Sequence, residues 1–468
     1  MLRNLQQPLS NGRNACLTAD DHKRLLIVYP YAFGTGWVGA TPRILHVARG
    51  LSELGWKVEL LRCKQPNEAQ LKPVVDAFPG RVVTAAFNGL YPALFNRKGL
   101  RLLFRLWLRR FRGSEDRKLM DVEVERIIRF VREGSTVSKP DVIWVVTVGF
   151  LAAPIAVQRL SELLICPYVV EIQDPVPHPG RPQLTKEQRD LWESCLNKAS
   201  LIITTTQGIS KQVETSFPNV RERLRTVYLT YDDHAQLRPP QVKATPDRMV
   251  LLHAGLLYGG GGRNANTLIQ GIAKAFERQS SVRGKLLLRL IGAGPGGDEA
   301  LTQSRALGLG AAVELLPQMP QSECDREMDR ADVLVAIKFD DPQYDMQVPG
   351  KIFQYLAHGK PILGLMRETE AAAVLRRSGL GIVKANSDID GIASALLELW
   401  NDHVSGLTRF QPNWEFIKTF SLSATAKTLN TELLRLLQSE DDGPRSVRND
   451  PGSSEPKSNF CPEMPKPS

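Results

Sequence analysis

The chain has 468 residues, more than one compact core accommodates, so its length predicts two domains. Its 42% hydrophobic and 24% charged residues are typical of a globular protein, and six scattered cysteines without a Cys-x-x-Cys pair argue against a disulfide framework or zinc site. Residues 1–240 hold 34 basic and 23 acidic residues, whereas residues 241–468 hold 26 and 27, so the basic excess of the first half favours an anionic partner such as nucleic acid or lipid headgroups.

Neither a leader nor a membrane span is predicted at the start of the chain. Residues 1–22 lack the apolar core of a signal peptide and are expected to be disordered. The most apolar window, residues 142–157, is 16 residues long, and a spanning helix needs about 20. We therefore interpret this window as a buried strand that runs into a helix. The scattered cysteines further favour reduced thiols in a cytoplasmic protein.

Short apolar runs then alternate with helical patterns, which predicts two α/β domains with parallel sheets. In the first half a helix is expected at 41–55, and strands at 25–29, 57–62, 141–147, 167–172, 201–206 and 223–228. A polar, proline-containing passage at 234–248 is typical of a linker.

The pattern restarts after this linker. Strands are expected at 249–255, 285–292, 312–317, 332–337 and 361–365, followed by a helix at 421–438. The predicted organisation is a first domain at 23–240, a second at 246–403, a helical segment at 404–438 and a disordered tail at 439–468.

Three glycine-rich turns follow strands, at 33–39, 258–266 and 291–297. Glycine lets backbone N–H groups approach a phosphate, although ordinary tight turns explain such loops equally well. The first and third also match G-x-G-x-x-G, and Glu59 and Glu314 have the spacing of ribose-binding acids. A nicotinamide-dependent oxidoreductase is therefore an alternative, weakened because residues 30–33 separate the first strand from its glycines.

Arg263 follows four successive glycines and precedes a predicted helix. A guanidinium in that place is suited to binding phosphate, and a solvated surface arginine is the alternative.

Segments 253–275, 286–317 and 348–363 resemble, in this order, those of family-four glycosyltransferases of the GT-B type. Segments 51–61 and 167–176 are similar to the acceptor domain of that family, and the resemblance covers about residues 23–438. It implies an α/β fold of two facing Rossmann-like domains, with the C-terminal helix returning to the first. It further implies a nucleoside diphosphate sugar bound mainly by the second domain, and sugar transfer with retained configuration. Cations and helix N-termini would take the place of a metal, and no cofactor is expected.

The resemblance also implies the site. Asp174 and His178, in the loop 171–180, would steady the transferred sugar, although a loop cap and a surface histidine are the simpler interpretations. Gly350 and Lys351 would lie near the diphosphate and Gln354 near the ribose. Arg263 is expected both to bind the donor and to act on the departing diphosphate. The remaining expected donor-binding residues are Gly36, Gly261, Gly262, Asn264, Gly292, Gly294 and Lys338.

Several positions depart from the family pattern. Leu256 stands where an arginine is common, so Arg263 acts alone or with Lys338 or Lys351. Met346 and Gln354 replace a pair of glutamates, and a glutamine oxygen accepts a hydrogen bond without charge assistance. Asp345 is the only carboxylate near the first position. A nucleotide-sugar-binding partner protein with little or no transferase activity is therefore the alternative to an enzyme.

The segment 97–112 carries seven cations and no acid, with leucine, phenylalanine and tryptophan on one helical face. This composition is typical of a helix in a bilayer interface, where each cation contributes about 1 kcal/mol. A buried amphipathic helix with a solvated basic face is the alternative. No recognition motif accompanies the charge, so nucleic acid is not expected. The sequence thus predicts a cytoplasmic enzyme on the inner face of the plasma membrane, acting on a saccharide or lipid-linked acceptor in cell-surface polysaccharide or glycolipid synthesis.

Overall fold

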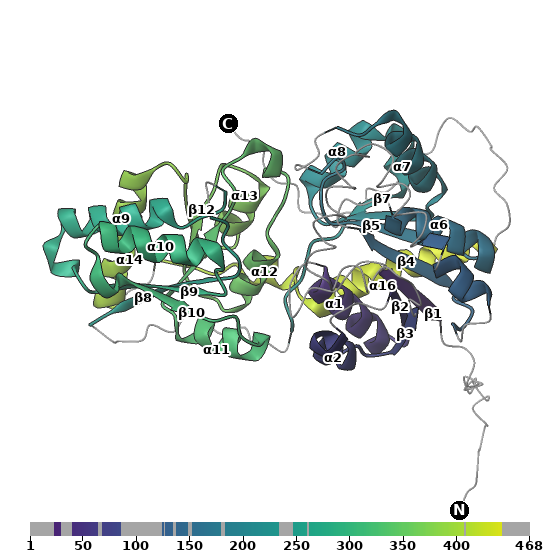
Figure 1. Ribbon diagram of the computed structural model, residues 1–468, viewed down its shortest axis with the longest axis horizontal. Coiled ribbons are helices and arrows are strands. Elements are labelled where there is room, and N and C mark those ends of the chain that lie inside the picture. Colours follow the sequence, from purple (N-terminus) through teal and green to yellow (C-terminus); the bar gives the residue numbers. More distant parts are fainter. Residues whose placement is uncertain are drawn as a thin grey trace, which may run out of the picture.

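The computed structural model describes residues 23–29, 40–63, 68–85, 124–125, 127–133, 137–147, 152–178, 183–233, 247–259, 262–406 and 409–441. They form two lobes, each built on a parallel β-sheet with helices packed against it (Figure 1). The predicted α/β fold with two Rossmann-like domains is confirmed.

The first domain holds a seven-stranded sheet in the order β3-β2-β1-β4-β5-β6-β7. Its strands are β1 (Arg24–Tyr29), β2 (Lys57–Cys63), β3 (Arg81–Ala85), β4 (Val142–Thr147), β5 (Tyr168–Ile172), β6 (Leu201–Thr204) and β7 (Leu224–Thr226). Alternate residues of β1 enter different cores: Leu26 and Val28 join one hydrophobic cluster, and Leu25 and Ile27 join the other. A central strand buried on both faces requires such a continuous apolar run.

Helices cover both of these cores. Among them are α1 (Thr41–Glu53), α2 (Glu68–Asp76), α6 (Ala152–Leu164), α7 (Lys186–Lys198), α8 (Gln207–Ser216) and the 3-10 turn η1 (Pro218–Arg223). Helix α8 has Thr206 as its N-cap, and the Thr206 hydroxyl accepts the Ile209 N–H at 3.1 Å. The predicted strand 201–206 therefore ends at Thr204, because the next two residues turn the chain into this helix.

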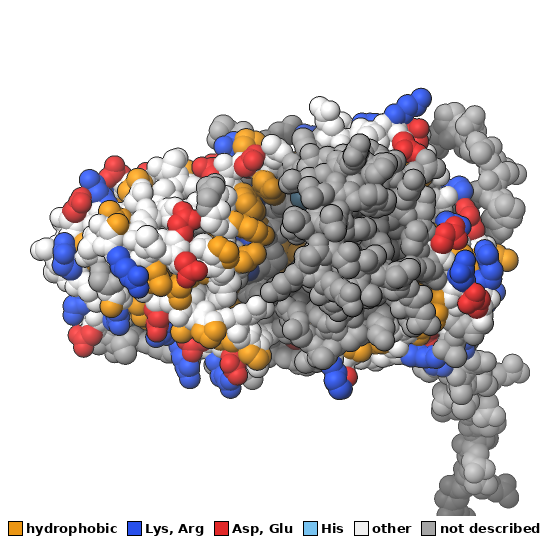
Figure 2. Space-filling model, viewed as in Figure 1, with side chains coloured by type: hydrophobic (Ala, Val, Ile, Leu, Met, Phe, Trp, Pro, Cys, Tyr) orange, Lys and Arg blue, Asp and Glu red, His pale blue; other side chains and the backbone are white. Residues whose placement is uncertain are grey.

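The second domain holds a six-stranded sheet in the order β10-β9-β8-β11-β12-β13. Its strands are β8 (Met249–Ala254), β9 (Leu286–Ile291), β10 (Val313–Leu316), β11 (Val333–Ile337), β12 (Ile362–Leu365) and β13 (Gly381–Lys384). Its helices are α9 (Asn266–Arg278), α10 (Pro295–Ala306), α11 (Gln321–Arg330), α12 (Gly350–Ala357), α13 (Glu370–Arg377), α14 (Ile389–Ser405) and α15 (Trp414–Lys418), with 3-10 turns η2 (Ser280–Val282), η3 (Gly310–Ala312) and η4 (Pro342–Tyr344). Basic and acidic side chains are interspersed over the face of this domain seen in Figure 2, in agreement with its balanced charge.

The last helix, α16 (Leu422–Asp441), returns to the first domain and lies against α1, as the resemblance implied (Figure 1). Leu429 and Leu433 enter the first-domain core, and the Trp56 indole N–H donates to Asn430 Oδ1 at 2.7 Å. Gly50 of α1 permits the close approach, since a Cβ there would lie 2.6 Å from the Cβ of Ala426. The second domain is thus connected to the first by the chain in both directions.

Candidate active site

The candidate site lies at the carboxyl end of the second sheet. Strand order reverses between β8 and β11, which pair in the middle of this sheet but are separated in sequence by β9 and β10. Ligands of open α/β sheets bind outside the carboxyl ends of the strands at such a switch point. Helix α12 begins near this point, and Figure 1 places it where the two lobes meet.

Two side chains of α12 dock the helix onto the end of β8. Lys351 Nζ lies 3.1 Å from His253 Nε2, and one turn later the Tyr355 hydroxyl accepts the Ala254 N–H at 2.9 Å. Burial, with the neighbouring charge of Arg263, lowers the pKa of the Lys351 ammonium well below its usual value. Because burial disfavours the charged form of this lysine, an anion bound beside it would stabilise the ammonium.

Arg263 is fixed by both a carbonyl and aromatic rings. Its Nε and Nη2 donate to Leu256 O at 3.1 and 2.8 Å, and its guanidinium lies over the Tyr258 and Phe339 rings, 5.4 and 5.5 Å from their centroids. Burial lowers the pKa of this guanidinium. The charge of Arg263 contributes to the lowered pKa of Lys351, so these two predicted cations lie near each other.

Two predicted residues of the glycine loop, Gly262 and Asn264, determine how the chain runs into α9. Asn264 Oδ1 accepts the Asn266 N–H at 3.0 Å, at the start of this helix. A Cβ on Gly262 would approach the Phe339 ring to 3.2 Å, so glycine lets the loop lie close to that ring. Asn264 therefore fixes the loop where α9 begins. Gly262 lets the loop come close enough to the Phe339 ring for Arg263 to lie beside it.

A cavity of about 410 Å³ adjoins this cluster at the ends of β9 and β10. Gly292 and Gly294 line it with φ values of +61° and +57°, which favour glycine, and a Cβ on Gly294 would lie 2.6 Å from Leu256 Cδ1. The leucines Leu256 and Leu315 also line it. Apolar walls with exposed backbone edges suit a nucleoside, and this volume accommodates one.

Gln354 lies on α12 one turn after Lys351 and is half-buried. Its side-chain amide makes no hydrogen bond to the part of the chain that the structure describes. It is thus available to a ligand at this end of the helix. Gly350 begins the helix, where a Cβ would lie 3.2 Å from Leu229 Cδ1 of the first domain.

Lys338 lies in a different cluster from the other two cations. It is 3% exposed, and its Nζ donates to Asp345 O at 3.0 Å and reaches Thr369 Oγ1 at 3.5 Å. Burial lowers its pKa to about 8, against the opposite effects of Asp345 and Glu370. Its described contacts therefore belong to the loop that meets the first domain.

Asp174 and His178 approach the second domain from the loop after β5. The Gln347 side chain donates to Asp174 Oδ1 at 2.7 Å across the domain boundary. Burial raises the pKa of Asp174, while His178 and the bond from Gln347 act against this rise. Burial and the Asp174 charge together raise the pKa of Tyr29, at the end of β1, to about 12. The structure thus places Asp174, His178 and Tyr29 at one end of the first sheet, facing the second domain.

Met346, which stands at the position of the family's first glutamate, contacts the first domain. Its side chain packs against a first-domain core cluster, and its carbonyl accepts the Thr206 hydroxyl at 2.6 Å. A Cβ on Gly208 would lie 2.7 Å from that of Met346, so glycine permits the contact. Asp345 pairs with Arg367 at 3.1 Å.

Glu370 was not among the predicted residues. Its carboxylate accepts the backbone N–H groups of Gln207 and Gly208 at 2.9 and 2.8 Å, and the Tyr228 hydroxyl at 2.6 Å. All three donors belong to the first domain, so the N-terminus of α8 holds a carboxylate from the second. His253 was also missed, although a histidine two residues before the glycine that follows β8 was a visible signal.

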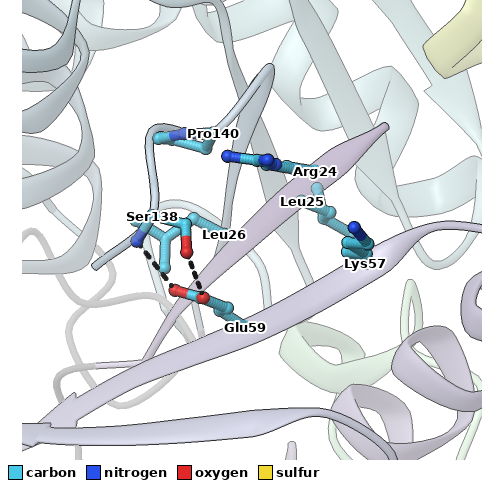
Figure 3. A pocket seen from close by; sticks show the side chains of 7 residues that line it. All are labelled: Arg24, Leu25, Leu26, Lys57, Glu59, Ser138 and Pro140. Atoms are coloured by element: carbon cyan, nitrogen blue, oxygen red, sulfur yellow. Dashed lines mark hydrogen bonds between the residues drawn. The ribbon is translucent and has the colours of Figure 1, made fainter. Parts of the chain in front are cut away.

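The two acids that favoured a dinucleotide site have other partners. Glu59 accepts the Ser138 N–H and hydroxyl at 3.2 and 2.8 Å, in a cavity of about 180 Å³ that Arg24 and Lys57 line at the amino end of the first sheet (Figure 3). Glu314 pairs with Arg289 at 2.7 Å. Glu59 therefore lies near the wrong end of its strand for a ribose.

Some predictions fall outside the described residues, namely those for residues 1–22, Gly36, Gly261 and the basic segment 97–112. The predicted tail 439–468 also lies outside them beyond Asp441, where α16 ends. Within the described ranges, no helix has the length and apolar character needed to cross a membrane. The same ranges hold no group of three or more His, Cys, Asp or Glu side chains placed to bind a metal ion.

Three solved structures illustrate the fold similarity. HepE of Anabaena in complex with UDP and glucose is 13% identical, with a TM-score of 0.59 over 88% of this chain and 100% of its own. Sucrose-phosphate synthase of Thermosynechococcus elongatus is also 13% identical, with a TM-score of 0.61 over 89% and 100%. The lipopolysaccharide outer core galactosyltransferase WaaB is 15% identical, with a TM-score of 0.56 over 88% and 99%. These likenesses show a shared fold. No curated protein sequence matches the chain.

Two sequence families account for most of the chain. The glycosyl transferase 4-like domain matches residues 38–230, and the glycosyl transferases group 1 domain matches residues 248–402. The two matches cover the two lobes in the order that the GT-B architecture requires, first domain and then second. The chain therefore belongs to the family-four glycosyltransferases of the GT-B type.

Proposed function

We propose that the protein transfers a sugar from a nucleoside diphosphate sugar to a saccharide or lipid-linked acceptor, with retained configuration and without a metal or other cofactor. The observation that carries this proposal is the pair of cations, Arg263 and Lys351, beside a cavity of nucleoside size at the switch point of the second sheet. HepE has been solved with UDP and with UDP-glucose, which supports a donor of this class.

Each part of the site has a role in this scheme. The cavity bounded by Leu256 and Leu315 takes the nucleoside, and the free amide of Gln354 accepts a ribose hydroxyl. Arg263, Lys351 and the N-terminus of α12 receive the diphosphate. Negative charge builds on the diphosphate as the glycosidic bond breaks, and fixed cations in a buried site stabilise it without reorganising.

The first domain supplies the groups for the transferred sugar. Asp174 and His178 lie at the carboxyl end of its sheet, and the bond from Gln347 brings Asp174 to the domain boundary. A carboxyl whose pKa is raised by burial changes readily between accepting and donating hydrogen bonds with sugar hydroxyls. We propose that the sugar displaces Gln347 from Asp174.

We also propose that the enzyme works in the cytoplasm, attached to the inner face of the plasma membrane through residues 97–112. The support is the seven cations of that segment and its apolar helical face. Changing Arg101, Arg105 and Arg109 to glutamate should abolish co-sedimentation with anionic vesicles. Unchanged co-sedimentation would contradict attachment through this segment.

A second candidate is a protein that binds a nucleotide sugar without transferring it. The observation in its favour is Met346, an apolar residue packed against the first domain where the family carries a glutamate. A transfer assay separates the two candidates. Purified protein is given UDP- and GDP-sugars with saccharide and lipid-linked acceptors, and nucleoside diphosphate release is followed. Release with an α-linked product from an α-linked donor supports the transferase, and tight binding without release supports the second candidate.

A further inference from the structure

His253 is a fully buried histidine at the carboxyl end of β8, and both of its ring nitrogens have partners. Nδ1 lies 2.9 Å from the Val335 carbonyl on the neighbouring strand β11, and Nε2 lies 3.1 Å from Lys351 Nζ. The imidazole therefore connects two central strands of the sheet to the first turn of α12.

These partners determine the tautomer. A carbonyl oxygen only accepts hydrogen bonds, so Nδ1 carries the proton and Nε2 has a free lone pair. Nε2 therefore accepts a hydrogen bond from the Lys351 ammonium. Burial, together with the charge of Lys351, lowers the pKa of His253 well below its usual value and outweighs the opposite effect of the Val335 and Gly255 backbone, so the ring stays neutral and does not compete for the positive charge.

Gly255 provides the space for the ammonium. Its φ is +113°, and a Cβ at this position would lie 3.0 Å from Lys351 Nζ. The absence of a side chain at Gly255 thus leaves a space at the end of β8. The Lys351 ammonium fills this space, with His253 on one side. No other hydrogen bond of Lys351 Nζ is found in the described ranges, so two of its three N–H groups are available.

We propose that His253 is a positioning residue that fixes the Lys351 ammonium for the diphosphate of the donor. This inference rests on the proposed function, and it assigns to the histidine no contact with the substrate. A lysine is a flexible point charge, and an ammonium held in one place loses less conformational freedom when the phosphate binds. The neutral imidazole provides this constraint without adding a third positive charge beside Arg263 and Lys351.

A double-mutant cycle tests the proposal. Dissociation constants for UDP and GDP, and for uridine and guanosine, are measured with wild-type protein, His253→Leu, Lys351→Ala and the double variant. We expect His253→Leu to weaken diphosphate binding roughly tenfold, a change typical of coupled neighbours, and to leave nucleoside binding unchanged. In the Lys351→Ala background, His253→Leu should have no further effect, because the group through which it acts is gone.

Two further variants separate positioning from packing. His253→Gln keeps an acceptor oxygen near the place of Nε2 and should restore most of the diphosphate affinity. His358→Leu, at the other end of α12 where the ring bonds Asp329 at 2.9 Å, should leave diphosphate affinity unchanged. The inference is wrong if His253→Leu weakens diphosphate and nucleoside binding alike, or does so equally with and without Lys351. If the wild-type protein binds neither diphosphate, the proposed function itself is wrong, and this inference is overturned with it.

Discussion

The backbone N–H of Gln207 in the first domain donates to the carboxylate of Glu370 in the second at 2.9 Å. Gly208 and Tyr228 donate to the same carboxylate, so a single acid accepts three bonds across the domain boundary. With the bond that the Thr206 hydroxyl accepts from Ile209, the N–H groups of Gln207, Gly208 and Ile209, which lack a partner within α8, are all satisfied. The arrangement of the two lobes therefore depends on this carboxylate.

We predict that Glu370→Gln loosens the contact between the lobes. Its amide NH₂ would face one of the present donors, and charge-assisted bonds would become neutral, a loss of about 2 kcal/mol. Small-angle X-ray scattering should show a larger radius of gyration than for the wild type. Glu368→Gln is the matched control, because Glu368 pairs with Arg376 at an exposed position and makes no hydrogen bond to the described residues of the first domain. Equal radii for both variants would remove Glu370 from the domain contact.

Arg263→Ala should weaken nucleoside diphosphate binding by one to two orders of magnitude, measured by calorimetry. Arg263→Lys should recover little of it, because an ammonium cannot make the two bonds to Leu256 O or stack between two aromatic rings. Arg278→Ala is the control, at the far end of the helix α9 that follows the Arg263 loop, since Arg278 pairs with Asp390 at the surface. An unchanged dissociation constant in Arg263→Ala would place the diphosphate elsewhere.

Gln354→Glu should tighten binding of the nucleotide sugar several-fold or raise turnover. A carboxylate accepts the ribose hydroxyls with charge assistance, and such bonds are roughly twice as strong as neutral ones. Gln188→Glu serves as control, because Gln188 completes the capping box of α7 and glutamate fills that role equally well. If Gln354→Glu changes neither binding nor turnover, α12 only packs at this position.

Lys338 gives the stability of the protein a pH dependence. Burial lowers its pKa to about 8, whereas an unfolded lysine has a pKa near 10.4. Between these values the unfolded chain holds a proton that the folded chain has released, so the free energy of unfolding rises with pH, by at most about 1.4 kcal/mol per unit. At pH 7 both states are protonated and the full penalty of the buried charge remains.

Lys338→Met should abolish this rise. Thermal unfolding at pH 7, 8 and 9.5 should therefore show the wild type gaining stability relative to the variant as the pH increases. A difference in Tm that stays constant over this range would mean that Lys338 keeps its proton when folded.

Most of the fold was predictable because central parallel strands are long apolar runs. The two strands that the pattern did not reveal, β3 and β13, lie at sheet edges. β13 is half-exposed along its whole length, and β3 buries only two of its five residues, so neither needs such a run.

The candidate site was predictable for residues that lie next to the end of a recognisable strand or helix. Arg263 and Lys351 each flank the end of a recognisable strand or helix, and the structure places both at the switch point. Glu370 resembles any acid in the first turn of a helix, and its partners lie more than 140 residues away. Its role follows from how the two domains meet, which no local pattern in the sequence specifies.

The proposed transfer depends on binding of a nucleoside diphosphate sugar to the second domain through Arg263 and Lys351. Its most direct test is thermal unfolding of the purified protein with UDP-sugars, GDP-sugars and NADH, for the wild type and for the Arg263→Ala, Lys351→Ala double variant. We expect a nucleotide sugar to raise the Tm of the wild type, the double variant to lose this shift, and NADH to give none. Protection by NADH, or equal protection of both proteins by the nucleotide sugar, would contradict this binding site.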